Sequence, residues 1–205
     1  FADRFREALA RALRPYGISE NEFARTYALL RREKNGCLSY SPERHLAVLA
    51  KNCVFNLREA QRACATVMQN APRFLDPQAA LMLRTLRQRG HRLVLMTRGE
   101  AEFQNKKISA LGLRGYFHRI IVSPRRKHLS FPHLALGNGA LVFINDNAKE
   151  LHEIHRVLPR AVLIERVRRG APRTLKPWPV FSTLPAIGRA VARLHRYPKN
   201  VERRT

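Results

Sequence analysis

The feature that most constrains the fold is a regular alternation of short apolar segments with amphipathic helices after residue 76. Four apolar runs rich in β-branched residues are separated by segments of helical periodicity, and they read "HRLVLMT", "HRIIVS", "ALVFIN" and "RAVLIERV". Continuous apolar strands are typical of a parallel sheet that helices cover on both faces. We therefore predict an α/β fold with a Rossmann-like parallel sheet flanked by helices.

The first 75 residues carry helix signals and no convincing strand. Apolar spacing near 3.6 over residues 2–14 ends at a Pro-Tyr-Gly turn, and Ser19 with Glu22 has the spacing of a capping box. Ser41 followed by Pro42 favours the start of a third helix, and residues 56–69 favour a fourth. The sequence thus predicts a helical block that precedes the α/β part.

Composition excludes several classes of protein. No apolar run approaches the ~18–20 residues of a membrane span, and residues 1–15 lack the apolar core of a secretory signal. The three cysteines lack C-x-x-C spacing and fit reduced thiols in an intracellular protein. His152 and His155 are three residues apart, whereas the metalloprotease pair is four apart. We expect a soluble, cytoplasmic protein with no membrane partner.

Charge is the most unusual aspect of the composition. The formal net charge is +24, and residues 76–205 hold 26 Lys and Arg against 8 Asp and Glu. Such an excess favours polyanionic partners, namely nucleic acid, phosphorylated substrates or an anionic surface. The alternative is an Arg-rich composition without a role in binding, because no aromatic residues alternate with the cations as stacking platforms would require.

Chemistry-bearing side chains follow three of the predicted strands. Ligands bind at the carboxyl ends of strands in such sheets, and there the chain places Thr97, the cation cluster 125–127 and Asp146. Glu150 follows Asp146 by one helical turn, and two such carboxylates suit Mg²⁺. A hydroxyl, a cation and a carboxylate pair at one edge indicate metal-assisted phosphoryl transfer. Taken alone, an Asp before a helix is more often the cap of that helix than a metal ligand.

The order of these residues closely resembles the haloacid dehalogenase-like (HAD) hydrolase superfamily. The stretch 86–123 is similar to the region around that family's second motif, with Thr97 and the backbone of Arg98 as phosphate ligands. Lys127, or alternatively Arg126, resembles the cation of the third motif. "FINDNAKE" resembles the fourth motif, so that Asp146 and Glu150 would be the Mg²⁺ ligands, with Glu in place of the more usual Asp.

The resemblance also implies a domain organisation. Residues 1–14 would be the core helix after the first strand, residues 15–75 an inserted helical cap, residues 76–196 the core, and residues 197–205 a flexible tail. In such proteins the cap selects the substrate, and Tyr40 and Arg44 in the loop "KNGCLSYSPER" are candidate contacts.

One motif of the family is missing from the printed sequence. The nucleophile and the general acid of HAD enzymes are two aspartates in an Asp-x-Asp motif that ends the first, central strand, whereas "FADRF" offers only Asp3 with no strand before it. The strands that end at Thr97 and Asn145 would then flank a gap with unpaired edges. We expect this strand to precede Phe1, or another segment to fill its place.

Three functions are compatible with these observations. The first is a Mg²⁺-dependent phosphatase that acts through an aspartyl-phosphate on a phosphorylated small molecule or nucleotide. The second is a catalytically inactive HAD-like protein that binds nucleic acid or a ribonucleoprotein through its basic surface. The third is a phosphatase that acts on phosphorylated nucleic-acid ends. Dehalogenation is less favoured because the dehalogenases of this superfamily do not use Mg²⁺, which would leave Asp146 and Glu150 without a purpose.

Overall fold

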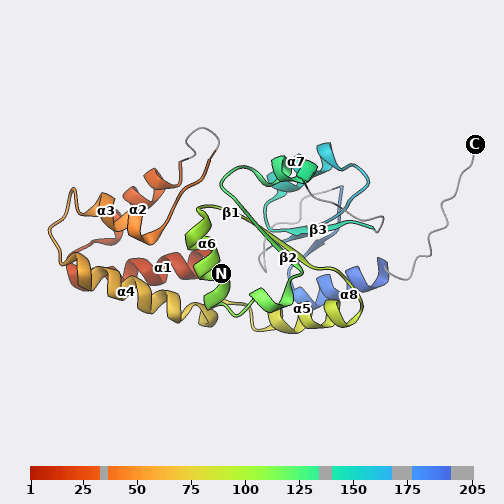
Figure 1. The fold of residues 1–205 in the computed structure, drawn as a ribbon, viewed down its shortest axis with the longest axis horizontal. Helices are drawn as coiled ribbons and strands as arrows, with labels where there is room; N and C mark the ends of the chain where they lie inside the picture. Colours follow the sequence, from red (N-terminus) through yellow and green to blue (C-terminus); the bar gives the residue numbers. More distant parts are fainter. Residues whose placement is uncertain (33–36, 134–139, 168–176, 195–205) are drawn as a thin grey trace, which may run out of the picture. The chain divides into compact units, whose positions relative to one another are not determined.

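The computed structural model describes residues 1–32, 37–133, 140–167 and 177–194, and Figure 1 shows its elements. The chain forms two compact units, each built from two segments. The first unit consists of Phe1–Asp76 with Val94–Lys127, and the second consists of Pro77–Leu93 with His128–Thr205. From residue 77 onward helices and parallel strands alternate, which confirms the predicted α/β class.

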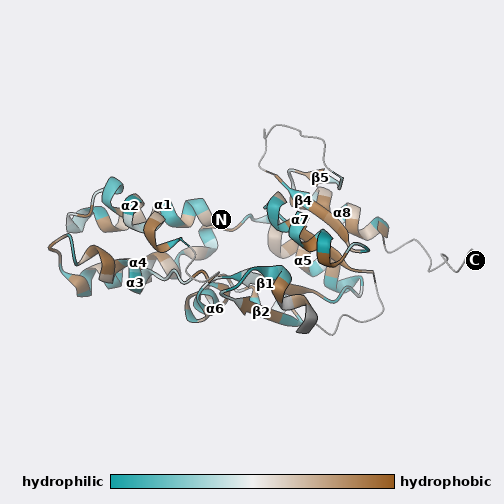
Figure 2. Ribbon diagram, turned by 90° about the horizontal axis from the view of Figure 1, so that it is seen from above, coloured by the Kyte–Doolittle hydropathy of each residue, from teal (hydrophilic) through white to brown (hydrophobic). Residues whose placement is uncertain are grey.

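The helices of the first unit follow the predicted pattern closely. The described residues of the segment 1–76 form four α-helices and two short 3₁₀ turns, namely α1 (Ala2–Leu13), η1 (Arg14–Tyr16), α2 (Glu20–Leu30), α3 (Pro42–Leu49), α4 (Leu57–Gln69) and η2 (Ala71–Phe74). Gly17 ends the first helical segment with a φ of 78°, a left-handed conformation that favours glycine. The alternation of hydrophilic and hydrophobic residues along these helices can be followed in Figure 2.

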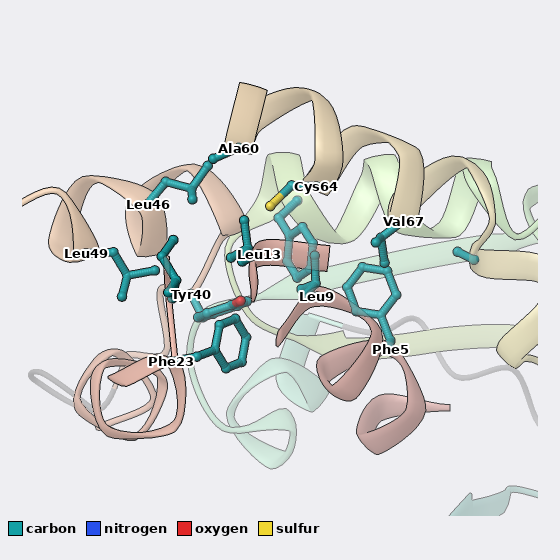
Figure 3. Close-up of a cluster of buried hydrophobic side chains, with 13 residues drawn as sticks. Phe5, Leu9, Leu13, Phe23, Tyr40, Leu46, Leu49, Ala60, Cys64 and Val67 are labelled. Carbon is teal, nitrogen blue, oxygen red and sulfur yellow. The ribbon is translucent and has the colours of Figure 1, made fainter. Parts of the chain in front are cut away.

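The core of the first unit is built from one face of each helix. Phe5, Leu9 and Leu13 recur every four residues along α1 and are all buried, and α1 packs against α4 through them. Figure 3 shows these side chains meeting Cys64 and Val67 of α4. Burial raises the pKa of the Cys64 thiol to about 12, so this cysteine is a packing residue in its protonated form.

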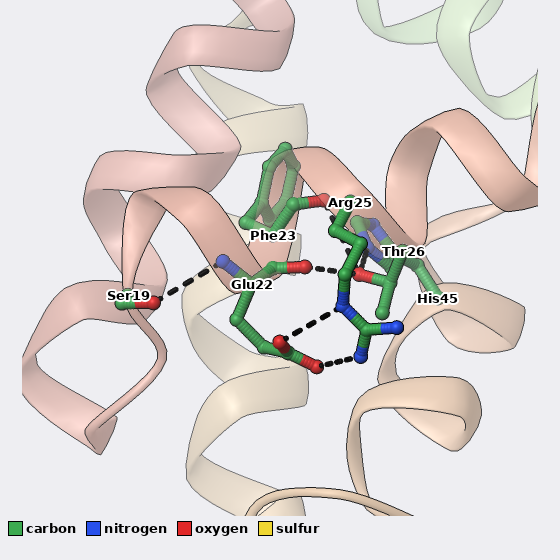
Figure 4. Close-up of polar contacts among 6 residues, drawn as sticks. All are labelled: Ser19, Glu22, Phe23, Arg25, Thr26 and His45. Atoms are coloured by element: carbon green, nitrogen blue, oxygen red, sulfur yellow. Dashed lines mark hydrogen bonds and ion pairs between the residues drawn. The ribbon is translucent and has the colours of Figure 1, made fainter.

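Helix starts obey the predicted capping rules with one difference. Ser19 accepts a 3.1 Å hydrogen bond from the Glu22 N–H, and Ser41 accepts one of 3.3 Å from the Arg44 N–H. The reciprocal half of the capping box is not formed, because the Glu22 carboxylate binds the Arg25 guanidinium at 2.7 Å instead (Figure 4). The salt bridge is one turn further along the same helix, where Arg25 outcompetes the backbone N–H of Ser19.

A buried polar triad joins α2 to α3. The Thr26 hydroxyl donates to the Glu22 carbonyl at 2.7 Å and therefore accepts from His45 Nε2, also at 2.7 Å (Figure 4). His45 Nδ1 is then the acceptor for the Tyr40 hydroxyl at 3.3 Å. Desolvation lowers the pKa of His45 to about 4, so the ring is neutral and both of its nitrogens are hydrogen-bonded.

The first unit also contains a two-stranded parallel sheet. Strand β1 (Val94–Arg98) pairs with β2 (Arg119–Ser123), and their register places Thr97 opposite Val122. Helix α6 (Ala101–Ala110) and η3 (Arg114–Tyr116) connect the two strands. The parallel register puts the carboxyl ends of both strands at one edge of this sheet.

The second unit holds a three-stranded parallel sheet. Strands β3 (Val142–Asn145), β4 (Val162–Arg166) and β5 (Val180–Phe181) lie in that order, with Asn145 opposite Glu165. Helix α7 (Ala148–Val157) packs on β3 and β4, whereas α5 (Gln78–Gln88) and α8 (Leu184–Leu194) pack on each other. The predicted short helix after β2 is η4 (Lys127–His133), and the rest of that prediction falls outside the described residues.

Burial differs between the two sheets. The three central residues of β4 are buried, as expected for a covered parallel strand. Neither β1 nor β2 contains a fully buried residue, although both are apolar runs. Among the described residues, β1 and β2 pair only with each other, and β3 pairs only with β4. Strands β1, β2 and β3 therefore each present one edge to which no described strand is hydrogen-bonded.

The predicted boundaries after residues 14, 75 and 196 separate a core helix, a cap, a core and a tail, and they remain predictions. The two units described above are instead the parts of the chain that each pack compactly. The predicted tail, residues 197–205, lies outside the described residues. In the described ranges, none of the helices has both the length and the apolar character of a membrane span.

Candidate functional site

The predicted site residues lie in both units. Thr97, Arg98 and Lys127 belong to the first unit, and Asp146 and Glu150 belong to the second. Within each unit the structure brings predicted residues together at the end of a strand: Thr97 and Arg98 close β1, and Asp146 follows β3.

Thr97 is oriented by a residue that the sequence analysis did not single out. Its hydroxyl donates a 3.1 Å hydrogen bond to Gln104 Oε1, and Gln104 Nε2 donates to the Arg98 carbonyl at 3.4 Å. Gln104 is buried, although it lies on a helix rich in charge. The sequence signal for this contact was an amide on the inner face of the helix, seven residues after Thr97.

Gly99 allows Gln104 to approach the end of β1. Its φ is +146°, and a Cβ atom at this position would lie 2.5 Å from Gln104 Nε2. The Gly99 N–H donates to the Ser123 carbonyl at 2.9 Å, which continues the β1–β2 ladder by one residue. Any side chain here would displace the amide that holds Thr97.

The start of α6 is already capped by a carboxylate. Glu100 accepts hydrogen bonds from the N–H groups of Glu102 at 2.9 Å and Phe103 at 2.7 Å. The N–H groups of Glu102 and Phe103 are therefore already hydrogen-bonded to Glu100 and do not face an anion. Of the groups expected to bind an anion at the end of β1, the main one is then the Thr97 hydroxyl.

The cation cluster follows the end of β2. Ser123 Oγ accepts from the Arg125 N–H at 3.1 Å, which fixes the turn, and Lys127 opens η4. Arg126 and Lys127 are both half-buried and Arg125 is exposed. Burial therefore favours Arg126 and Lys127 equally as the cation of the third motif, and this assignment stays a prediction.

The turn after β3 is arranged around the side chain of Asn145. Its Oδ1 accepts from the N–H groups of Asp146 at 2.8 Å and Asn147 at 3.3 Å, and its Nδ2 donates to Glu150 Oε2 at 2.7 Å. Asn145 itself is buried. One amide therefore fixes the turn and orients the second predicted carboxylate.

The helix cap in this turn is Asn147 and not Asp146. Asn147 Oδ1 accepts from the N–H groups of Lys149 at 3.0 Å and Glu150 at 3.3 Å. The Asp146 carboxylate is exposed and makes no hydrogen bond or ion pair to any described residue. The capping role that could have explained Asp146 is thus taken by its neighbour, and its carboxylate is available for a ligand.

The donor set fits a hard cation that keeps several waters. Asp146 and Glu150 supply carboxylate oxygens one helical turn apart, and Mg²⁺ is often held by one or two carboxylates together with water and phosphate. In the described ranges no cluster of three or more His, Cys, Asp and Glu side chains is placed to hold a metal. His152 instead packs edge-on against Trp178, with ring centroids 4.6 Å apart.

The two residues expected in the cap loop have different surroundings. Tyr40 is buried among aromatic rings of the first unit, whereas Arg44 is oriented by a 3.0 Å hydrogen bond to the Ser39 carbonyl. The adjoining backbone is anchored by the Leu38 N–H, which donates to the Pro124 carbonyl at 2.8 Å. This contact places the loop beside the end of β2.

Comparison with solved structures identifies the fold. A HAD phosphatase from Thermococcus onnurineus aligns with 91% of this chain and 87% of its own at a TM-score of 0.63 and 16% sequence identity. The L-2-haloacid dehalogenase from Xanthobacter autotrophicus aligns over 91% and 93% of the two chains at a TM-score of 0.53 and 15% identity. The fold is that of the HAD-like hydrolases.

Other comparisons agree with this fold or find no match. The HAD-type protein YfnB from Bacillus subtilis, whose structure contains bound magnesium, aligns over 92% of this chain and 80% of its own at a TM-score of 0.52 and 13% identity. No protein-family model and no curated protein matches the sequence. The HAD-like fold confirms the expected architecture of parallel strands with an N-terminal helical region.

Proposed function

We propose that the protein is a Mg²⁺-dependent phosphatase that hydrolyses phosphate monoesters through an aspartyl-phosphate. The observation that carries the proposal is the turn after β3, where the Asp146 carboxylate is exposed beside Glu150, which Asn145 orients. Its spacing matches the fourth HAD motif, and the fold supports the match.

The chain's own residues would act on the phosphoryl group. Thr97 would turn its one hydroxyl proton from Gln104 Oε1 to a non-bridging oxygen, and Lys127 or Arg126 would neutralise its negative charge. Asp146 and Glu150 would hold Mg²⁺, which supplies charge neutralisation for the phosphoryl oxygens when it is bound. These groups stabilise charge and position the substrate, and they do not attack phosphorus themselves.

The covalent step requires an aspartate pair that we place on a strand outside the printed sequence. One carboxylate would attack phosphorus as the ester P–O bond breaks, and the second aspartate would protonate the leaving oxygen. Water would then attack the aspartyl-phosphate and give its proton to the same aspartate, which releases phosphate and regenerates the nucleophile. The edge of β1 without a described partner, and the incomplete burial of β1 and β2, support a missing neighbouring strand.

Two measurements test this proposal. Mass spectrometry of the native protein would reveal whether an apolar strand that ends in Asp-x-Asp precedes Phe1, and its absence from the native protein would rule out this mechanism. Mg²⁺ should raise the melting temperature, because a ligand that binds only the folded state stabilises it, and Asp146→Asn should abolish the shift.

The net charge of +24 favours a second candidate, a non-catalytic protein that binds nucleic acid. The densest basic stretches lie within 165–176 and 193–205, mostly outside the described residues. If this candidate is right, affinity for a random single-stranded oligonucleotide should fall steeply with salt, in proportion to the phosphates neutralised. Binding with a flat salt dependence would argue against it.

A further inference from the structure

The first unit contains a pocket of about 100 Å³ to which the proposed function has assigned no ligand group. Its walls come from α1, α2 and α6, together with Gly99, Arg31 and the segment around Tyr40. Five aromatic side chains and three cationic ones line it, and the lining contains no Asp or Glu. A pocket with this lining favours an anion that also carries an apolar body.

The aromatic walls are held in place by one another. Tyr40 packs edge-on against Tyr27 at 4.8 Å and against Phe103 at 5.8 Å between ring centroids. Phe103 in turn contacts Phe5, whose ring is stacked on Phe1 at 5.6 Å. Since each ring touches at least one other, the apolar surface is formed before any ligand binds.

Lys107 lies among these rings without a carboxylate partner. Its Nζ is 5.3 Å from the centroid of Phe103 and 5.9 Å from that of Phe1, and no described acidic residue lies within ion-pair distance of it. Lys106, the preceding residue, instead pairs with Glu102 at 2.7 Å. Burial, with the nearby charge of Arg31, lowers the pKa of Lys107 to about 8.

Arg31 is the second cation without an acidic partner among the described residues. The third, Arg6, is already engaged by Asp3 at 3.4 Å and lies over the Tyr27 ring. Arg31 is exposed, whereas Lys107 is partly buried beside two aromatic faces, and an uncompensated cation is costly to keep in such a place. An anion that enters the pocket would relieve that cost.

We propose that this pocket binds a small aromatic carboxylate, whose charge is met by Lys107 and Arg31 and whose ring packs against the aromatic walls. The volume is about two thirds of that of an apolar cavity that accommodates benzene, about 150 Å³, so it limits a ligand to at most one ring, with the charged group at the mouth. Charge and shape together exclude a large or cationic ligand.

The pocket adjoins the end of β1 through Gln104, which lines it and also accepts the hydrogen bond of Thr97. On the proposed phosphatase function, on which this step rests, the pocket receives the leaving group of the substrate. The substrate class is then the phosphate monoester of a small aromatic acid, with the phosphoryl group at Thr97.

Binding is tested first without turnover. Benzoate should stabilise the purified chain against heat in a concentration-dependent manner, and Lys107→Met and Arg31→Gln should each weaken its affinity about tenfold, as expected when a charge-assisted contact is lost. Lys106→Met is the matched control, because it removes the same charge one residue away on α6 and should leave the affinity unchanged. Equal binding of neutral benzamide, equal binding of inorganic phosphate, or equal weakening by the control would overturn the proposal.

Turnover separates this inference from the proposed function. The native protein should hydrolyse 4-carboxyphenyl phosphate with a KM about tenfold lower than that for phenyl phosphate, and Lys107→Met should remove this preference. Benzoate binding without hydrolysis of either ester would retain the pocket and reject the phosphatase function. If both esters are hydrolysed with equal KM, or if they are hydrolysed but benzoate does not bind, the proposed pocket is rejected and the phosphatase function is retained.

Discussion

The side-chain amide of Asn145 donates a 2.7 Å hydrogen bond to Glu150, one turn into the helix that follows β3. The same side chain accepts the N–H groups of the two residues that follow it. A single buried amide therefore fixes both the turn and the second carboxylate of the proposed metal site.

Asn145→Ala should lower both stability and Mg²⁺ affinity. Removing the amide leaves N–H groups and a carboxylate without their partner, which should cost about 1–3 kcal/mol of unfolding free energy. Residues that orient a metal ligand typically contribute about 10–100-fold to affinity, so Mg²⁺ titrations followed by thermal melting should show a loss of this order. Asn147→Ala removes only the helix cap, and equal Mg²⁺ affinities in the two variants would contradict an orienting role for Asn145.

Thr97→Val should reduce phosphatase activity without unfolding the protein. The substitution keeps the shape of the side chain but removes the hydroxyl, and the loss of one donor to the phosphoryl group typically costs about a hundredfold in rate. Thr97→Ser keeps the hydroxyl and should retain most of the activity. Steady-state kinetics on a phenyl phosphate ester would measure both, and wild-type rates in Thr97→Val would remove Thr97 from the site.

Gly99→Ala should be destabilising for two separable reasons. A φ of +146° is strained for alanine by about 1–3 kcal/mol, and the added Cβ would displace Gln104 from Thr97. The same substitution in a Gln104→Ala background should cost less, because only the backbone strain remains. Chemical denaturation of the four proteins measures the difference, and strict additivity would show that the clash is irrelevant.

Acid should destabilise the first unit through His45. The pKa of His45 is lowered from 6.5 to about 4 by burial, so the unfolded chain binds this proton more readily than the folded chain does. The stability due to the neutral ring is therefore complete above pH 6.5 and is lost as the pH falls from 6.5 to about 4, by about 3 kcal/mol in total. His45→Gln should flatten the urea-derived stability curve in this window, and an unchanged slope would assign the acid sensitivity to other groups.

The fold followed from local patterns, whereas the details of the site depended on contacts between distant residues. Strand β1 and helix α6 were evident from periodicity, but the hydrogen bond between Thr97 and Gln104 arises only when the helix packs on the strand. Strand β5 was missed because two residues, Val180 and Phe181, are too short to show a period.

The role of Asp146 shows the same limit. An aspartate before a helix is more often a cap than a metal ligand, and nothing in "INDNAKE" distinguishes the three candidate side chains. Only the backbone geometry gives the cap to Asn147 and leaves the Asp146 carboxylate exposed.

The decisive measurement is hydrolysis of p-nitrophenyl phosphate by the native protein, with and without Mg²⁺, alongside the Asp146→Asn variant. We expect turnover that requires Mg²⁺ and falls at least about a hundredfold in the variant, since removal of one important electrostatic group at such a site costs about that much. The substitution replaces a carboxylate by an amide of nearly the same size, so melting curves of the two proteins without Mg²⁺ should coincide. No turnover by the native protein, or turnover that the substitution leaves unchanged, would contradict a Mg²⁺-dependent phosphatase.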